Sequence, residues 1–297
     1  MAHDGIRAHV LDLAAEGQTS LGDVGLHLYR YRQRTALAQL TSRGVGFCLV
    51  LQGSKRLQAA SQMLQAAAGE MIVVARDADL RAVVHSDPVA GPYLALGVWF
   101  DPERVGRALL RLAELKVPAP PAEAAADLPA FTSPPTDDIR SAVERLLHAV
   151  RDPIDRKTIA PLVLDELMFR LLRTDAAAAV RAGMGPPQEV ARILDVMQFI
   201  RDHHTRKLTV RVLAKRAAMS PSNFAHQFSR IAHSSPMKYV REVRLERARA
   251  LLGEHGARPT KVARTTGFES AAHFSREFKR RYGTPPSRYR DRVLTAQ

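Results

Sequence analysis

The chain has 297 residues, 46% of them hydrophobic, and a formal net charge of +14. This length can bury a large core and suffices for two domains, and the excess positive charge favours a polyanionic partner. No run of about 20 apolar residues occurs, which argues against a membrane-spanning protein. Cys48 is the single cysteine, so a disulfide within the chain is excluded.

The positive charge is concentrated in the C-terminal third. From Ile200 onward there are 22 Lys and Arg against 7 Asp and Glu, whereas the residues before it have 22 against 23. The basic segment is therefore the part expected to meet the polyanion.

Two features indicate the compartment. The N-terminus lacks the basic and apolar segments of a secretory signal peptide. Cys48 lies between Phe47 and Leu49 and is expected to be a buried core thiol rather than a redox sensor. A cytoplasmic protein without membrane contact is expected.

The first half of the chain reads as a short helix followed by strands. Residues up to Ala15 fit the helix, and residues 16–23 fit a turn. Strands are then expected around Leu26 and Leu28 and at residues 47–51, 71–75, 80–85 and 93–100. Short strands with turns at roughly 8–12-residue spacing predict a sandwich or a small barrel.

Helices are expected to follow. Asp101-Pro102 begins one, and residues 116–136, rich in Pro and Ala, read as a connection. Amphipathic patterns predict further helices at residues 137–150, 154–172 and 190–200. Residues 176–179 read as a helix tail. The first two amphipathic segments either pack on the strands or form a dimer interface.

The stretch from Leu208 to Pro286 contains one pattern twice. Leu213-Ala214 and Ala218-Met219 recur 49 residues later as Val262-Ala263 and Gly267-Phe268. The first copy continues with Phe224, Phe228 and Pro236, and the second, after 50 residues, with Phe274, Phe278 and Pro286. A repeated supersecondary unit is therefore predicted.

Each copy reads as helix, tight turn and helix. Thr209 fits an N-cap of the first helix, and Ser220-Pro221 restarts the chain as N-cap and first helical residue. In the second copy Gly267 supplies the turn, Glu269-Ser270 the restart, and Gly283 the end, where a positive φ is needed. Two helix-turn-helix units are the predicted structure.

A long helix opened by Ser235-Pro236 and ended by Gly253 and Gly256 joins the two units. About 17 residues at roughly 1.5 Å each span about 25 Å. This is of the order needed to hold two helices one DNA turn, roughly 34 Å, apart.

The residues 237–252, MKYVREVRLERARALL, resemble the linker helix of AraC/XylS-type regulators, and residues 267–286, GFESAAHFSREFKRRYGTPP, resemble the second-unit signature of that family. The resemblance covers roughly the last 100 residues. Pro259 departs from the pattern where an aliphatic residue is usual, which would shorten the start of that helix. Ala271 and Ala272 replace larger polar residues.

The N-terminal half is similar to the cupin-like barrel of the same family. The similarity is carried by Tyr29-Arg30 and by residues 47–53, 69–75 and 92–96. It implies a candidate small-molecule effector pocket in the barrel and dimerisation through this half. The expected fold class is α+β and multidomain. Its parts are a cupin-like effector domain at 1–116, a Pro/Ala-rich connection with helices at 117–186, and an all-α double helix-turn-helix domain at 187–297.

The family pattern implies roles for the exposed residues of the two second helices. Base edges in the major groove are read by side chains of an inserted helix. The base-reading residues are expected to be Ser222, Asn223, Ala225, His226, Ala271, Ala272, His273 and Arg276. The phosphate-binding residues are expected to be Ser220, Arg230, Ser270 and Lys279.

No motif of an enzyme or a metal centre was found. His27 and His85 stand alone in the barrel, without the closely spaced His pair of cupin enzymes, and His203-His204 point about 100° apart on a helix. The sequence also has no Walker A, G-x-S-x-G or H-E-x-x-H motif. No catalysis, metal or cofactor is therefore expected.

The hypothesis from sequence is a DNA-binding transcriptional regulator, and the expected sign of regulation is activation. Its partners would be double-stranded operator DNA, a small-molecule effector, RNA polymerase and a second copy of the chain. The alternative is a ligand-sensing module that acts through protein partners and binds DNA weakly. An architectural nucleoid protein is disfavoured, because its neutral half would have no role.

Overall fold

The computed structural model describes residues 2–42, 44–59, 62–87, 89, 91–117, 128–253 and 257–289. The chain divides into two compact units, Met1–Val190 and Ala191–Gln297. The division into three parts, with boundaries at residues 117 and 187, stays a prediction.

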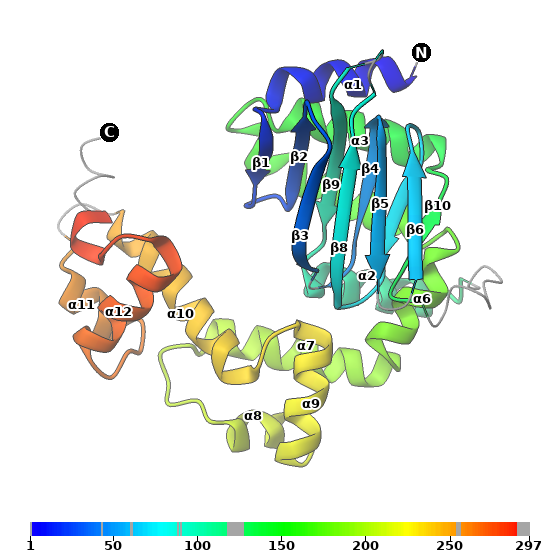
Figure 1. Cartoon of the computed structure of the whole chain (residues 1–297). Helices are drawn as coiled ribbons and strands as arrows, with labels where there is room; N and C mark the ends of the chain where they lie inside the picture. The colour runs from blue at the N-terminus through cyan, green and yellow to red at the C-terminus, as the bar shows by residue number, and fades with distance from the viewer. Residues whose placement is uncertain are drawn as a thin grey trace. The chain divides into compact units, whose positions relative to one another are not determined.

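Two antiparallel sheets form the centre of the first unit (Figure 1). The six-stranded sheet has the order β1 (Gly17–Leu21), β2 (Leu26–Tyr31), β9 (Tyr93–Trp99), β4 (Gly46–Gln52), β7 (Met71–Val74) and β10 (Ala130–Ser133). The four-stranded sheet has the order β3 (Thr35–Ser42), β8 (Ala78–His85), β5 (Ser54–Ala59) and β6 (Gln62–Ala67).

The burial of each strand follows from its place in this arrangement. All seven residues of β4 are buried, which fits a continuous apolar run covered on both faces. In β5 buried and exposed residues alternate, so one of its faces meets solvent. Cys48 lies buried on β4 as a free thiol, as expected.

Helices accompany the sheets. They are α1 (Ala2–Leu13), α2 (Pro102–Glu114), α3 (Asp137–Ala149), α4 (Asp155–Thr158), α5 (Ala160–Leu171) and α6 (Ala176–Met184). Helix α7 (Pro187–Asp202) begins in the first compact unit and continues into the second. Helix α1 packs on β2, β4 and β9 of the six-stranded sheet and on α3, which in turn packs on α5. Thus α3 packs mainly on helices α1 and α5 rather than on the strands, and the dimer interface stays a prediction.

The barrel implied by the family resemblance is not observed in the described residues. Neither sheet closes on itself, and each ends in two edge strands. The β-rich character is confirmed, but the two sheets face each other as separate layers (Figure 1).

Three local predictions were wrong. Residues 17–21, expected in a turn, pair with β2 as an edge strand. Residues 130–133, inside the expected connection, pair with β7. Residues 176–184 form the separate helix α6 rather than a tail, because Ala177, Ala179 and Val180 are buried. Each error concerns a short segment whose structure depends on distant partners.

Helices α8 (Val210–Arg216), α9 (Pro221–Ala232), α10 (Pro236–Leu252), α11 (Pro259–Thr265) and α12 (Ala271–Tyr282) belong to the second unit. The two helix-turn-helix units predicted from the repeat are α8–α9 and α11–α12, with α10 between them. Pro259 is tolerated as the first residue of α11, where its missing N–H costs no hydrogen bond. None of the helices in the described residues has the length and apolarity needed to cross a membrane.

Candidate nucleic-acid interface

The turns within the two helix-turn-helix units have the same backbone conformation but different residues. Ala218 (φ 52°) holds the left-handed position between α8 and α9, and Gly267 (φ 86°) holds it between α11 and α12. In both turns the next amide donates to a carbonyl of the preceding helix: Met219 to Ala214 at 3.0 Å, and Phe268 to Ala263 at 2.9 Å. The repeat in sequence is therefore a repeat in structure.

Each second helix begins with a serine cap. The Oγ of Ser220 accepts from the amide of Asn223 at 3.3 Å, and the Oγ of Ser270 accepts from that of His273 at 3.1 Å. Both hydroxyls keep their own hydrogen to donate, and the helix N-terminus favours an anion. This geometry is compatible with the phosphate role expected for the two serines.

The inner faces of α9 and α12 are aromatic. Phe224 and Phe228 are fully buried in the first helix-turn-helix unit, and Phe274 and Phe278 take the equivalent places in the second helix-turn-helix unit. Along the first nine positions the two helices bury and expose the same places in the same order. The remaining positions form two equivalent outer faces.

The expected base-reading residues lie on these outer faces. Ser222, Asn223, His226, Ala271, Ala272, His273 and Arg276 are exposed, and Ala225 is half-buried. His226 and Arg276 occupy equivalent positions, and neither side chain makes a hydrogen bond or ion pair with any other described residue. Their polar groups are available to a partner.

Two of the expected residues are already engaged within the protein. His273 lies 3.9 Å from a carboxylate oxygen of Glu277, and its ring meets that of Phe268 edge-on at 5.9 Å. Arg230 donates from Nε to Oε1 of Gln227 at 2.9 Å. Both side chains therefore have partners within the protein. Lys279, in contrast, is exposed.

Sequence reasoning missed Glu277, the only carboxylate on α12. Its side chain is 13% exposed and accepts from Arg241 on α10 at 3.3 Å, and it also pairs with Arg280. The cations offset a charge that would repel a polyanion. The 50-residue spacing of the repeat pairs Glu277 with Gln227 of α9. The sequence alone could therefore have identified this position as one where the two helices differ in charge.

Helix α10 contacts both helix-turn-helix units, because the ring of its Tyr239 meets that of Phe228 on α9 edge-on with the centres 5.5 Å apart. Arg244 donates to the backbone carbonyls of His204 at 2.8 Å and Arg206 at 2.9 Å, and burial lowers its pKa. On the other side Leu245, Ala248 and Leu252 enter the same apolar cluster as Phe274 and Phe278. The linker helix therefore packs against both helix-turn-helix units rather than only joining them.

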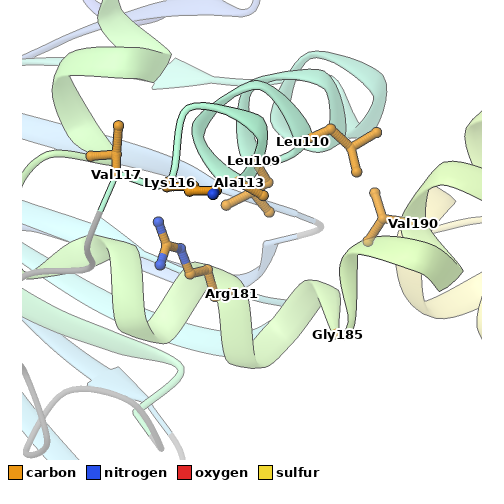
Figure 2. Close-up of a pocket in the computed structure, with 8 residues that line it drawn as sticks. All are labelled: Leu109, Leu110, Ala113, Lys116, Val117, Arg181, Gly185 and Val190. Carbon is orange, nitrogen blue, oxygen red and sulfur yellow. The ribbon is translucent and has the colours of Figure 1, made fainter.

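In the first unit, a pocket of about 410 Å³ lies between the end of α2 and the segment from α6 to α7 (Figure 2). It combines an apolar lining with two cations. The lining residues are Leu109, Leu110, Ala113, Lys116, Val117, Arg181, Gly185 and Val190. Its size is in the range of small-molecule sites.

A trio of possible metal ligands also lies in the first unit. The ligand atoms of His9 on α1 and of Glu144 and His148 on α3 are within 4.8 Å of one another. Burial, followed by the neighbouring charges of His148 and Arg151, lowers the pKa of His9. Because the Arg151 guanidinium would also repel a metal ion, we do not assign a metal centre here.

Family models match both units. The model of the AraC-type transcriptional regulator N-terminus matches residues 24–179, and that of a helix-turn-helix domain matches residues 213–292. The first match alone covers more than half of the chain.

Individual relatives cover shorter stretches. The arabinose operon regulatory protein of Salmonella typhimurium is 28% identical over 129 residues, 43% of this chain and 44% of that protein. The HTH-type transcriptional regulator Rv1931c of Mycobacterium tuberculosis is 41% identical over 78 residues, 26% of this chain and 30% of that protein. The chain thus spans less than half the length of these curated relatives.

Among solved structures, an apo variant of ToxT from Vibrio cholerae is similar over 93% of this chain and 98% of its own, with a TM-score of 0.46 and 11% identity.

Proposed function

This chain belongs to the AraC-type family of transcriptional regulators, and from that premise we propose that its second unit binds operator DNA with α9 and α12 in adjacent major grooves. The observation that carries the proposal is the pair of equivalent outer faces on two capped helices. The basic balance of the segment from Ile200 onward supports it.

Base reading is assigned to the outer faces. His226 and Arg276 would donate to guanine, and the alanines would contact thymine methyl groups. Ser222, Asn223 and His273 complete the reading set. Ala225 is half-buried and His273 is in contact with Glu277. Both residues can therefore touch only bases that lie directly against the helix surface.

Phosphate binding is assigned to the helix ends. Ser220 and Ser270 would donate from their hydroxyls at the N-termini, and Lys279 and Arg230 would supply charge. These contacts fix the register of the helices on the duplex without reading its sequence.

Regulation is assigned to the first unit. We propose that a small-molecule effector binds between its two sheets, that the unit dimerises, and that the DNA-bound protein activates transcription by contacting RNA polymerase. The helix α7 supports a connection between the units, since it begins in one and ends in the other.

A pair of substitutions tests the DNA assignment. Arg276→Ala is expected to cost about 1–3 kcal/mol at one base pair and to relax specificity there. Lys279→Ala should weaken binding evenly across sequences and lower the slope of log affinity against log salt by about 1. Binding of both variants to a library of single-base operator variants at several salt concentrations measures this.

An unchanged base profile of the Arg276 variant would remove this residue from the reading set. A flat preference of the wild-type protein across random DNA would instead favour the second candidate, a ligand sensor that acts through protein partners.

A further inference from the structure

The space between the two sheets of the first unit contains a lysine. Lys55 on β5 points inward with Leu57 and Ala59, and it is 7% exposed. Its Nζ lies 3.5 Å from Sγ of Cys48 on β4 and 5.7 Å from the ring centre of Tyr29 on β2. The side chain therefore reaches from one sheet to the other.

No carboxylate offsets this charge in the described residues. The inward-facing positions of β2, β4, β5, β8 and β9 carry neither Asp nor Glu. The two neighbours of Nζ are a thiol, which accepts weakly, and an aromatic ring. A buried ammonium is normally paired with a carboxylate or another anion, because losing its hydration costs considerable free energy.

Further hydrogen-bond donors belong to the aromatic residues of this interior. The Tyr93 hydroxyl is buried and has no hydrogen-bond partner of ordinary geometry in the described part of the chain. The Tyr29 hydroxyl and the Trp99 indole nitrogen each lie 3.6 Å from the point where a Cβ on Gly97 would stand. Burial raises the pKa of both tyrosines, so they stay protonated and able to donate.

The aromatic residues of this interior are not fully closed off from solvent. Tyr29, Tyr31 and Trp99 are packed against the core cluster but only partly buried. Their inward neighbours include the small residues Ala95 on β9 and Ala82 on β8. A ligand bound here would meet aromatic rings, the Lys55 ammonium and the Tyr93 hydroxyl.

We propose that the effector of this regulator is a small carboxylate with an apolar body, its anionic group held by Lys55 and the Tyr93 hydroxyl and its body against Tyr29 and Trp99. The inference rests on the proposed effector site and adds the chemical class of its ligand. A sugar or another neutral polyol would leave the ammonium unpaired.

The single tryptophan of the chain provides a local signal. Acetate, benzoate, salicylate and inorganic phosphate are titrated into the full-length protein while Trp99 fluorescence is recorded, with benzamide as the uncharged match of benzoate. We expect a saturable change with benzoate or salicylate, and an affinity for benzamide at least about 30-fold lower, since one charge-assisted contact contributes roughly that factor. Absence of a saturable change with every anion, or equal affinity for benzoate and benzamide, overturns the proposal.

Substitutions locate the site. Lys55→Met, close in volume, should lower the benzoate affinity at least about 30-fold and, without ligand, raise the melting temperature, because it removes an unpaired buried charge. Arg181→Gln, in the pocket of Figure 2, is the matched control and should leave the affinity unchanged. A loss that follows Arg181 rather than Lys55 would place the anion in that other pocket and overturn the assignment.

The DNA affinity of the same samples separates this inference from the proposed function. Anion binding with no DNA binding would refute the regulator and keep the ligand class. Specific DNA binding with no anion response would refute only the inference.

Discussion

Phe278→Ala is expected to lower the free energy of unfolding of the second unit by about 3–5 kcal/mol, the usual cost of removing a buried aromatic ring. Phe278 is fully buried, and its ring centre lies 5.5 Å from that of Phe274, 4.6 Å from that of Tyr282 and 5.5 Å from that of Tyr289. The loss leaves a cavity in the cluster that joins α10, α11 and α12. Amide hydrogen exchange in α12 measures the effect where it arises.

Phe278→Leu is the control for this result. It keeps most of the apolar volume and should cost less than about 1.5 kcal/mol. If Phe278→Ala changed the exchange of α12 no more than Phe278→Leu does, the aromatic cluster would not be the core of this unit.

Gly267→Ala is expected to destabilise the second unit by about 2–5 kcal/mol, through two separate costs. The residue has φ +86°, a left-handed conformation that costs an alanine about 1–2 kcal/mol. A Cβ there would also stand 2.9 Å from the carbonyl oxygen of His204 and 3.0 Å from Thr205 backbone atoms. Overpacking of this kind adds about 1–3 kcal/mol.

Gly283→Ala separates the two costs. Gly283 has φ +75°, but a Cβ there meets nothing within 4 Å, so only the backbone cost of about 1–2 kcal/mol applies. Urea unfolding of both variants, followed by circular dichroism, compares them. Equal destabilisation would mean that the segment at His204 does not pack against this turn as described.

The helix-turn-helix repeat could be predicted because its signals are local. Phenylalanines four residues apart define the buried faces of α9 and α12, and Ser220 and Ser270 mark their starts. The left-handed turn was predicted from glycine in the second copy only. In the first copy Ala218 and His233 adopt positive φ without it, so packing of the helices overrides the residue preference.

The four-stranded sheet was largely missed for a physical reason. Strand β5 carries Arg56 and Gln58 on exposed positions, and β6 carries Gln62 and Gln65, so neither strand contains a continuous apolar run. Closure into a barrel cannot be predicted from such patterns, because it depends on hydrogen bonds between strands distant in sequence.

Contacts between side chains of different elements could not be predicted from the sequence. The charge of Glu277 is offset by Arg241, 36 residues away, and the run that contains Lys55 reads as polar surface although the residue is buried between two sheets. In both cases the environment of the side chain comes from another element.

The central claim is tested most directly by selecting sequences bound by the full-length protein from a random DNA pool at physiological salt. If α9 and α12 both read bases, the bound sequences will share one asymmetric motif with two half-boxes about 10 base pairs apart. Binding that salt abolishes and that enriches no sequence would contradict it, because only the contribution of phosphate contacts would remain.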